Sequence, residues 1–374
     1  MISGARRRLR TALPLLTLAL LMSGMLPGAA AAATDPDQFP AGYQGYHTYT
    51  EMVAALNGAV ASYGEGPNAI AKLYNLGKSY EGRNIWAIKI SDNVATDERE
   101  PEILTECNMH AREHITAEQC LFLVSLLTNN YGQSTALGQR VTNIVNSREI
   151  WIVPMLNPDG AMFDIKGATF HGWRKNRQAN PGSNKIGIDL NRNWSYMWGC
   201  CGGSGPNPKS IKYRGRYPFE AVENQVLRDF ILSRRVDGVQ QISEVLNVHS
   251  YGNHVLYPYA YTKEDIPSDM TADDHATFVA LAKKMASLNG YRAMQGSDMY
   301  IYDGDFIDWA YGDQHMFAFT WEMYPRWGCG CGGFHPPDTV IARETTRNTN
   351  AALYLLEQAD CPYRSAGLGA AHCS

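Results

Sequence analysis

The chain has 374 residues, of which 45% are hydrophobic and 19% are charged. This is an ordinary globular composition, and the length is sufficient for a large core. The formal net charge of −4 is mildly acidic, which makes the chain a poor candidate for nucleic-acid binding.

The first 33 residues have the pattern of a signal peptide. Arg6–Arg10 supply a positively charged start, Leu13–Met25 is apolar but too short to span a membrane, and Ala29–Ala33 offers an A-x-A cleavage site. Removal of residues 1–33 takes away four Arg and no acid, so the formal charge moves from −4 to −8. Because no other segment is apolar enough for a membrane span, we expect a secreted, extracellular protein without a membrane anchor.

The rest of the chain alternates strand-like and helix-like runs. A short irregular segment, 34–44, precedes one domain at 45–360, and a C-terminal tail follows at 361–374. Strands are predicted at Ile85–Ile90, Ile103–Met109, Glu149–Leu156, Val245–Tyr257 and Phe317–Trp321. Helices are predicted at Tyr49–Ser62, Thr116–Asn130, Phe219–Leu232, Ala276–Leu288 and Val340–Leu356. This interleaving predicts a single-domain α/β fold, with a twisted, mixed but largely parallel central sheet and helices on both faces.

The segment His110-Ala-Arg-Glu113-His114 carries the clearest chemical signal. An imidazole from His110 and a carboxylate from Glu113 can bind zinc, and a third ligand with an open position would make the site catalytic. The pentapeptide also fits a helical H-x-x-E-H site, in which both histidines bind zinc. That geometry needs a helix, whereas the residues before His110 are strand-like and the helical run starts at Thr116, a plausible cap. A strand-to-helix turn is therefore predicted, and a surface turn without metal remains open on this segment alone.

Other residues of matching chemistry follow along the chain. His249 stands in a β-branched strand run, where a histidine is more often a satisfied core residue than a ligand. Glu322 ends an apolar strand, where a carboxylate is costly unless it is paired or functional, and burial would raise its pKa toward that of a general base. Arg174 and Arg192 stand beside aromatic residues. Near zinc, one arginine would stabilise an oxyanion and the other would grip a carboxylate.

Taken in order, the motifs from about Gly45 to Gln358 resemble the zinc metallocarboxypeptidases of the pancreatic carboxypeptidase A and B type, most closely their secreted actinobacterial members. The resemblance implies a peptide hydrolase that removes one C-terminal residue from peptides and proteins. The matching motifs are Gly77-Lys-Ser-Tyr-Glu-Gly-Arg83, His110-Ala-Arg-Glu113, Asn157-Pro-Asp-Gly160, Trp173-Arg174-Lys175, Asp189-Leu-Asn-Arg-Asn-Trp194, His249-Ser-Tyr251, Gly304-Asp-Phe-Ile-Asp-Trp309 and Thr320-Trp-Glu322.

The resemblance also implies the roles of the central residues. His110, Glu113 and His249 would hold one Zn²⁺ per chain, with water in the open position. Asp189 would orient His110, as partners of zinc-bound imidazoles usually do. Glu322 would be the general base that deprotonates the zinc-bound water and passes a proton to the leaving amine. We expect a monomer whose only partners are substrate C-termini.

Substrate contacts are implied in the same way. Arg174 would polarise the scissile carbonyl and stabilise the oxyanion. Asn191 and Arg192 would clamp the terminal carboxylate of the substrate, with Arg112 as an auxiliary contact. Relatives that cleave cell-wall peptides or acyl-amino acids often lose this clamp. A non-catalytic binding module would usually show a replaced ligand or base.

The family's mobile tyrosine stands eight residues before the Asp of an Asp-Trp pair. The pair here is Asp308-Trp309, which selects Tyr300 and leaves Tyr302 to face the side-chain pocket. The residue before the pair lies deep in that pocket, and Ile307 there favours aromatic and aliphatic C-terminal residues. Asp305 resembles the acid by which some bacterial members also accept Lys and Arg. The alternative is that it points to solvent or caps a turn.

All eight cysteines follow the predicted cleavage site, and an even count in a secreted chain suggests disulfides. Cys200 and Cys201 are expected to join the Gly-rich loop of Cys329 and Cys331, because a four-cysteine zinc site would need C-x-x-C spacing. A pair between residues 361 and 373 would tether the C-terminus. The resemblance to B-type enzymes implies a further disulfide between residues 107 and 120. At His114, where those enzymes usually have an aromatic residue, we expect a structural role.

Overall fold

An eight-stranded mixed sheet organises the protein in the computed structural model, which describes residues 38–66 and 69–373. The four central strands β4, β3, β7 and β10 are mutually parallel, which confirms the predicted α/β fold. In spatial order the strands are β1 (Ala71–Lys78), β2 (Asn84–Ile90), β4 (Glu149–Val153), β3 (Glu102–Cys107), β7 (Ile242–Ser250), β10 (Phe317–Met323), β8 (His254–Tyr257) and β9 (Arg292–Gln295). A separate small hairpin pairs β5 (Arg235–Val236) with β6 (Val239–Gln240).

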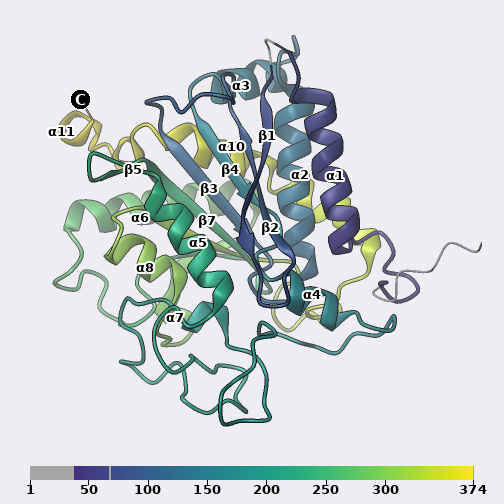
Figure 1. The fold of residues 1–374 in the computed structure, drawn as a ribbon. Coiled ribbons are helices and arrows are strands. Elements are labelled where there is room, and N and C mark those ends of the chain that lie inside the picture. Colours follow the sequence, from purple (N-terminus) through teal and green to yellow (C-terminus); the bar gives the residue numbers. More distant parts are fainter. Residues whose placement is uncertain (1–37, 67–68, 374) are drawn as a thin grey trace, which may run out of the picture. The chain divides into compact units, whose positions relative to one another are not determined.

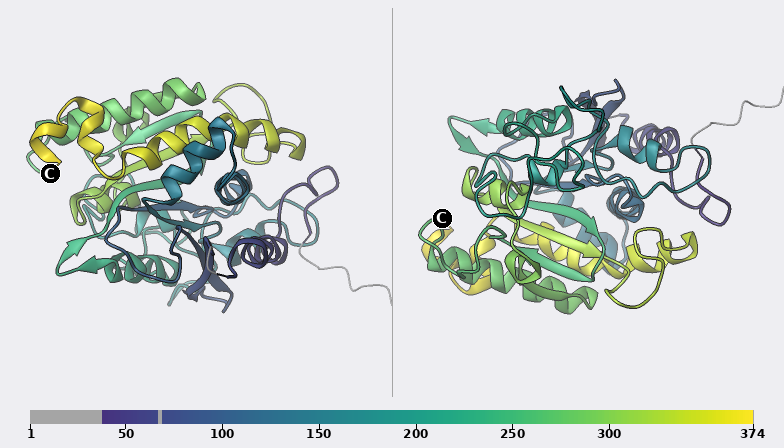
Figure 2. Two further views of the ribbon diagram at one scale, coloured as in Figure 1. Left: turned by 90° about the horizontal axis from the view of Figure 1, so that it is seen from above. Right: turned by 90° about the horizontal axis from the view of Figure 1, so that it is seen from below.

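Helices cover both faces of this sheet (Figures 1 and 2). The α-helices are α1 (Tyr49–Tyr63), α2 (His114–Asn130), α3 (Ala136–Val145), α4 (Pro158–Asp164), α5 (Val222–Ser233), α6 (Ala272–Asn289), α7 (Gly296–Met299), α8 (Phe306–Gly312), α9 (Ile341–Arg347), α10 (Thr349–Gln358) and α11 (Gly369–His372). Short 3-10 helices lie at η1 (Leu190–Arg192), η2 (Asp338–Val340) and η3 (Pro362–Ala366). Within the described ranges, no helix has the length and apolar character needed to cross a membrane.

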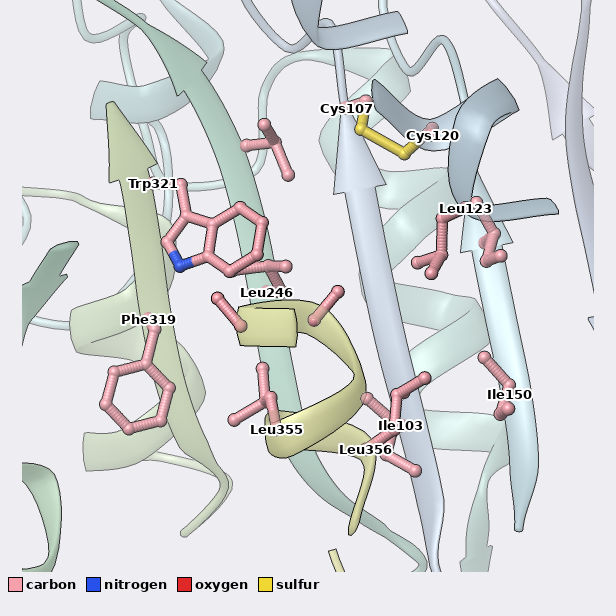
Figure 3. Packing of buried hydrophobic residues seen from close by; sticks show 14 of the residues in the cluster. Ile103, Cys107, Cys120, Leu123, Ile150, Leu246, Phe319, Trp321, Leu355 and Leu356 are labelled. Atoms are coloured by element: carbon pink, nitrogen blue, oxygen red, sulfur yellow. A yellow bond between two sulfur atoms is a disulfide. The ribbon is translucent and has the colours of Figure 1, made fainter. Parts of the chain in front are cut away.

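The alternation of side chains along the strands divides the core between the two faces. Ile103 and Leu104 are neighbours on β3 and are fully buried on opposite sides. Ile103 joins a cluster with α1, α2, α3, α6 and α10, part of which Figure 3 shows around Leu246 and Leu355. Leu104 joins a second cluster with α5 and α8. Burial on both faces explains why the central strands are continuous apolar runs.

The register of the parallel strands brings polar side chains to one edge. Glu322 on β10 pairs with His249 on β7, and Cys107 at the end of β3 pairs with Val248. All three strands therefore end at the same level. In open α/β sheets the carboxyl ends of the strands are where ligands bind.

Several predicted boundaries were wrong for identifiable reasons. Helix α2 begins at His114, two residues before the predicted cap. The Thr116 hydroxyl does not cap the helix, because it lies within the first turn and donates to the carbonyl of Glu113 (2.7 Å). The strand predicted at Val245–Tyr257 is two strands, because Asn253 turns the chain with a φ of 60° between β7 and β8. Similarly, the helix predicted at Val340–Leu356 is divided among η2, α9 and α10.

The disulfides agree with the expectations in part. Cys107–Cys120 and Cys361–Cys373 are paired as predicted. The predicted link between the two Gly-rich loops is wrong, because each loop closes on itself through Cys200–Cys201 and Cys329–Cys331. The loops pack on different segments: the Cys201 amide donates to Asp303 (3.2 Å), whereas Phe334, beyond the second loop, packs on Tyr251.

The Cys107–Cys120 disulfide ties the end of β3 to α2 across a loop of 13 residues (Figure 3). Replacing both cysteines with Ser should lower the free energy of unfolding by about 2–4 kcal/mol, because the unfolded chain gains entropy when the link is lost. Urea unfolding followed by circular dichroism measures this change. The double Ser variant of Cys361 and Cys373 opens a loop of 12 residues and should lose a similar amount for the same reason. An unchanged free energy of unfolding in either variant would contradict the expectation.

Candidate active site

Two histidines and a glutamate converge at the carboxyl edge of the sheet. Glu113 Oε1 lies 3.0 Å from His110 Nδ1, and Glu113 Oε2 lies 3.0 Å from His249 Nδ1. The three side chains are buried, and one donor atom from each lies within 4.8 Å of the others. His110 comes from the turn after β3, Glu113 from the residue before α2, and His249 from the end of β7. Two imidazole nitrogens and one carboxylate form a donor set that fits zinc.

Polar partners hold the far side of both imidazole rings. His110 Nε2 lies 3.1 Å from Asp189 Oδ1, and His249 Nε2 lies 2.7 Å from Asn247 Oδ1. The Asn247 amide donates in turn to Glu106, which fixes its orientation. Such partners leave the Nδ1 lone pairs directed at a metal. The sequence interpretation missed Asn247, although period-2 alternation places it on the same strand face as His249.

The protonation states match those of a metal site. Burial and the neighbouring His110 lower the pKa of His249 to about 4, so the imidazole is neutral. Burial alone would raise the pKa of Asp189, but Arg174 and His110 outweigh burial and bring it well below its ordinary value. In the same way His110 and His249 lower the pKa of Glu113 against the effect of burial. A neutral His249 imidazole beside an ionised Glu113 carboxylate is what zinc binding requires.

Two guanidinium groups lie beside the cluster. Arg174 donates from Nε to Asp189 Oδ2 (3.0 Å), and its Nη1 lies 3.8 Å from Glu113 Oε1. Arg192 is fully buried, donates from Nη2 to the Tyr300 hydroxyl (3.1 Å), and lies 4.7 Å from the ring centre of Tyr302.

One small cavity is lined by most of the predicted site residues. Its lining is His110, Arg174, Asn191, Arg192, His249, Met299, Tyr300, Tyr302, Thr320 and Glu322. The sequence interpretation did not single out Met299 or Thr320. Thr320 has a signal that could have found it, since it lies two residues before Glu322 on the same face of β10. Both candidate tyrosines line the cavity, and Tyr300 is the exposed one, at 39% against 4%.

Glu322 brings a carboxyl group into this cavity. Burial and the negative charge of Glu113 raise its pKa well above the ordinary value, and Arg174 and Arg192 oppose the shift. A carboxyl group with a raised pKa in such a cavity is suited to proton transfer near neutral pH.

Besides Glu113 and Asp189, three predicted residues lie outside the cavity lining. Asp305 precedes α8, is 1% exposed and makes no side-chain capping hydrogen bond. Burial raises the pKa of Asp305 to about 6, against the opposing charge of Arg192. Ile307 is fully buried in the core cluster on the α8 side of the sheet. Arg112 lies over the Phe334 ring (3.8 Å) and donates to a backbone carbonyl at residue 172 (3.3 Å).

Comparisons with known proteins agree with this geometry. The zinc carboxypeptidase family matches residues 62–351. A zinc carboxypeptidase of Saccharothrix mutabilis subsp. capreolus is 45% identical over 89% of this chain and 75% of that protein. Rat carboxypeptidase A1 is 32% identical over 87% of this chain and 73% of the rat protein.

Solved structures agree as well. Thrombin activatable fibrinolysis inhibitor superposes with a TM-score of 0.73 at 26% identity, over 84% of this chain and 74% of that chain. The model of the family covers more than half of the sequence, and the donor set of His110, Glu113 and His249 fits the metal that the family uses. The chain therefore belongs to the zinc carboxypeptidase family, whose members are zinc-dependent peptide hydrolases.

Proposed function

We propose that the protein is a secreted metallocarboxypeptidase that removes single C-terminal residues by base-assisted attack of water on the last peptide bond. The observation that carries the proposal is the cavity that the two histidine zinc ligands share with Glu322, Arg174 and Arg192. The signal-peptide pattern of residues 1–33, which lie outside the described residues, supports secretion. A monomer is proposed because all of these side chains come from one chain.

His110, Glu113 and His249 would hold the zinc ion. When bound, zinc supplies Lewis-acid chemistry, which polarises a carbonyl and lowers the pKa of water. Glu322 takes a proton from the attacking water and hands it to the leaving amine. Its raised pKa suits both steps, because the group must accept and then release a proton near neutral pH.

Arg174 and Arg192 bind different groups of the substrate. Arg174 is anchored by Asp189 and donates hydrogen bonds to the oxygen of the scissile carbonyl as negative charge develops there. Arg192, with Asn191, binds the terminal carboxylate of the substrate, and the Tyr300 hydroxyl lies within reach of the same guanidinium. This division accounts for exopeptidase cleavage, because an internal residue has no carboxylate for Arg192. Arg112 remains a predicted auxiliary contact.

Dual specificity is proposed for the side-chain pocket. Ile307 is predicted to favour aromatic and aliphatic residues, while Asp305 would attract Lys and Arg. The burial of the Asp305 carboxylate supports this role, since a cationic substrate would offset the cost of an ionised group there.

Hydrolysis of three blocked dipeptides, ending in Phe, Arg and Phe-amide, tests the proposed function. We expect cleavage of the first two and not of the amide, because the amide lacks the carboxylate that Arg192 binds. A zinc chelator should abolish both activities, and added zinc should restore them. Failure of folded, zinc-loaded protein to cleave any of the three would point instead to a cell-wall amidase or a binding module.

Replacing Asp305 with Asn should lower kcat/KM for the Arg substrate by about 10- to 100-fold, the value of a hydrogen bond between charged groups. Because its pKa is about 6, the wild-type ratio of Arg to Phe hydrolysis should increase as the pH rises through that value and Asp305 becomes charged. The variant should lose this pH dependence. The Phe substrate is the internal control, and an equal loss on both substrates would exclude Asp305 from specificity.

A further inference from the structure

A second cluster of two histidines and a carboxylate lies outside the catalytic cavity. Asp164, the last residue of α4, has its Oδ2 at 3.0 Å from His114 Nε2 and at 3.1 Å from His335 Nε2. One donor atom from each residue lies within 4.8 Å of the other two. His114 begins α2, and His335 lies in the loop between β10 and η2. Three segments that are distant in sequence thus meet at one carboxylate oxygen.

This cluster has the donor chemistry of the catalytic one. In both, two imidazole nitrogens stand 3.0–3.1 Å from a buried carboxylate. The other oxygen of Asp164 accepts a hydrogen bond from the backbone N–H of Trp173 (2.5 Å). This bond orients the carboxylate, in the way that hydrogen bonds orient the ligands of a metal site. Ring contacts hold both imidazoles: Phe39 packs against His114 (4.9 Å) and Phe170 stacks on His335 (3.8 Å).

A buried carboxylate lies at the centre of this cluster. Asp164 is fully buried, and its described side-chain partners are the two imidazoles rather than a Lys or Arg. Burial alone would raise the pKa of Asp164, but His114 and His335 outweigh burial, so the carboxylate is ionised. A buried carboxylate flanked by two imidazole nitrogens is a donor set that a divalent transition ion can use.

We propose that His114, Asp164 and His335 form a second metal site, which binds Zn²⁺ or a similar divalent transition ion. Two imidazole nitrogens and a carboxylate oxygen suit such ions better than Ca²⁺ or Mg²⁺, which prefer oxygen ligands. The His335 side chain is 20% exposed, so solvent can reach the site and complete the coordination.

The site is separate from the catalytic centre. His114 follows Glu113 in sequence, but its ring contacts Phe39 and Phe170 and does not line the catalytic cavity. A bound ion would tether the loop after β10 to the start of α2. This role goes beyond the proposed peptidase function and does not depend on it.

Metal content measured by mass spectrometry after equilibration of the full chain in buffered, low-micromolar Zn²⁺ tests the site. We expect about two zinc ions per chain for the wild type and about one for His335→Phe, which keeps an aromatic ring beside Phe170. The matched control is His171→Phe, which removes an exposed histidine nearby and should keep both ions. With Co²⁺ in place of zinc, the His335→Phe variant should likewise lose one of two equivalents.

Thermal unfolding gives a second readout. The second zinc equivalent should raise the Tm of the wild type and of His171→Phe, and leave that of His335→Phe unchanged. A wild type that takes up a single ion, or a His335→Phe variant that retains two, would show that the cluster is a hydrogen-bonded brace and overturn the proposal. Loss of peptidase activity without loss of the second ion would bear only on the catalytic site.

Discussion

Replacing Glu322 with Gln should lower kcat by about 10²- to 10⁴-fold, the range that a general acid–base group contributes. Gln keeps the size of the side chain and cannot accept the proton of the attacking water. The KM and the zinc content should change little, because Glu322 is not among the residues that hold the metal or the substrate carboxylate. Steady-state kinetics on the Phe dipeptide, with zinc measured on the same sample, check both expectations.

The matched control is Glu244→Gln, on the neighbouring strand β7. Glu244 is also buried, and burial raises its pKa well above the ordinary value, but it lies outside the cavity lining. This variant should keep its activity. In the wild type, kcat/KM should rise with pH through the raised pKa of Glu322, because only the ionised group is a base. A Glu322→Gln enzyme with near-normal kcat would remove Glu322 from the mechanism.

The sequence predicts the parts of this fold in which hydrophobic periodicity is strong. Helix α1 and strand β2 lie within one residue of their predicted bounds. Strand β1 was missed because it lies at the edge of the sheet, where polar side chains face solvent and no apolar run is needed. Helix α8 was missed because six of its seven residues are buried, so no polar face marks a helical period.

The site, like the fold, contains residues that the sequence predicts and residues that it does not. His110 and Glu113 are three residues apart, and their spacing alone suggested zinc. His249 is 136 residues from Glu113, and no local pattern links the two. Asn247 was missed because its position depends on register: it pairs with Glu106 on β3 and with Thr320 on β10, forming one polar row across three strands. Register follows from tertiary packing, which a single sequence does not display.

Replacing Arg174 with Ala should lower kcat by about 10²- to 10³-fold, the loss measured when one oxyanion donor is removed, or about 2.7–4 kcal/mol of transition-state stabilisation. The loss should fall on kcat rather than KM, because the charge that Arg174 stabilises develops only in the transition state. Arg174→Lys should recover part of the activity, since it keeps the charge but not the planar fork of donors.

Zinc content decides how the Arg174 result is interpreted. Arg174 also bonds to Asp189, which orients His110, so its loss could weaken metal binding rather than catalysis. A zinc-loaded variant with a reduced kcat supports the oxyanion role, whereas a variant that loses zinc shows that Arg174 acts through Asp189. The control is Arg177→Ala, on the same segment, whose guanidinium stacks on Phe163 (3.6 Å) outside the cavity. An unchanged kcat with a raised KM would instead make Arg174 a substrate-binding residue, because uniform binding of substrate and transition state changes KM alone.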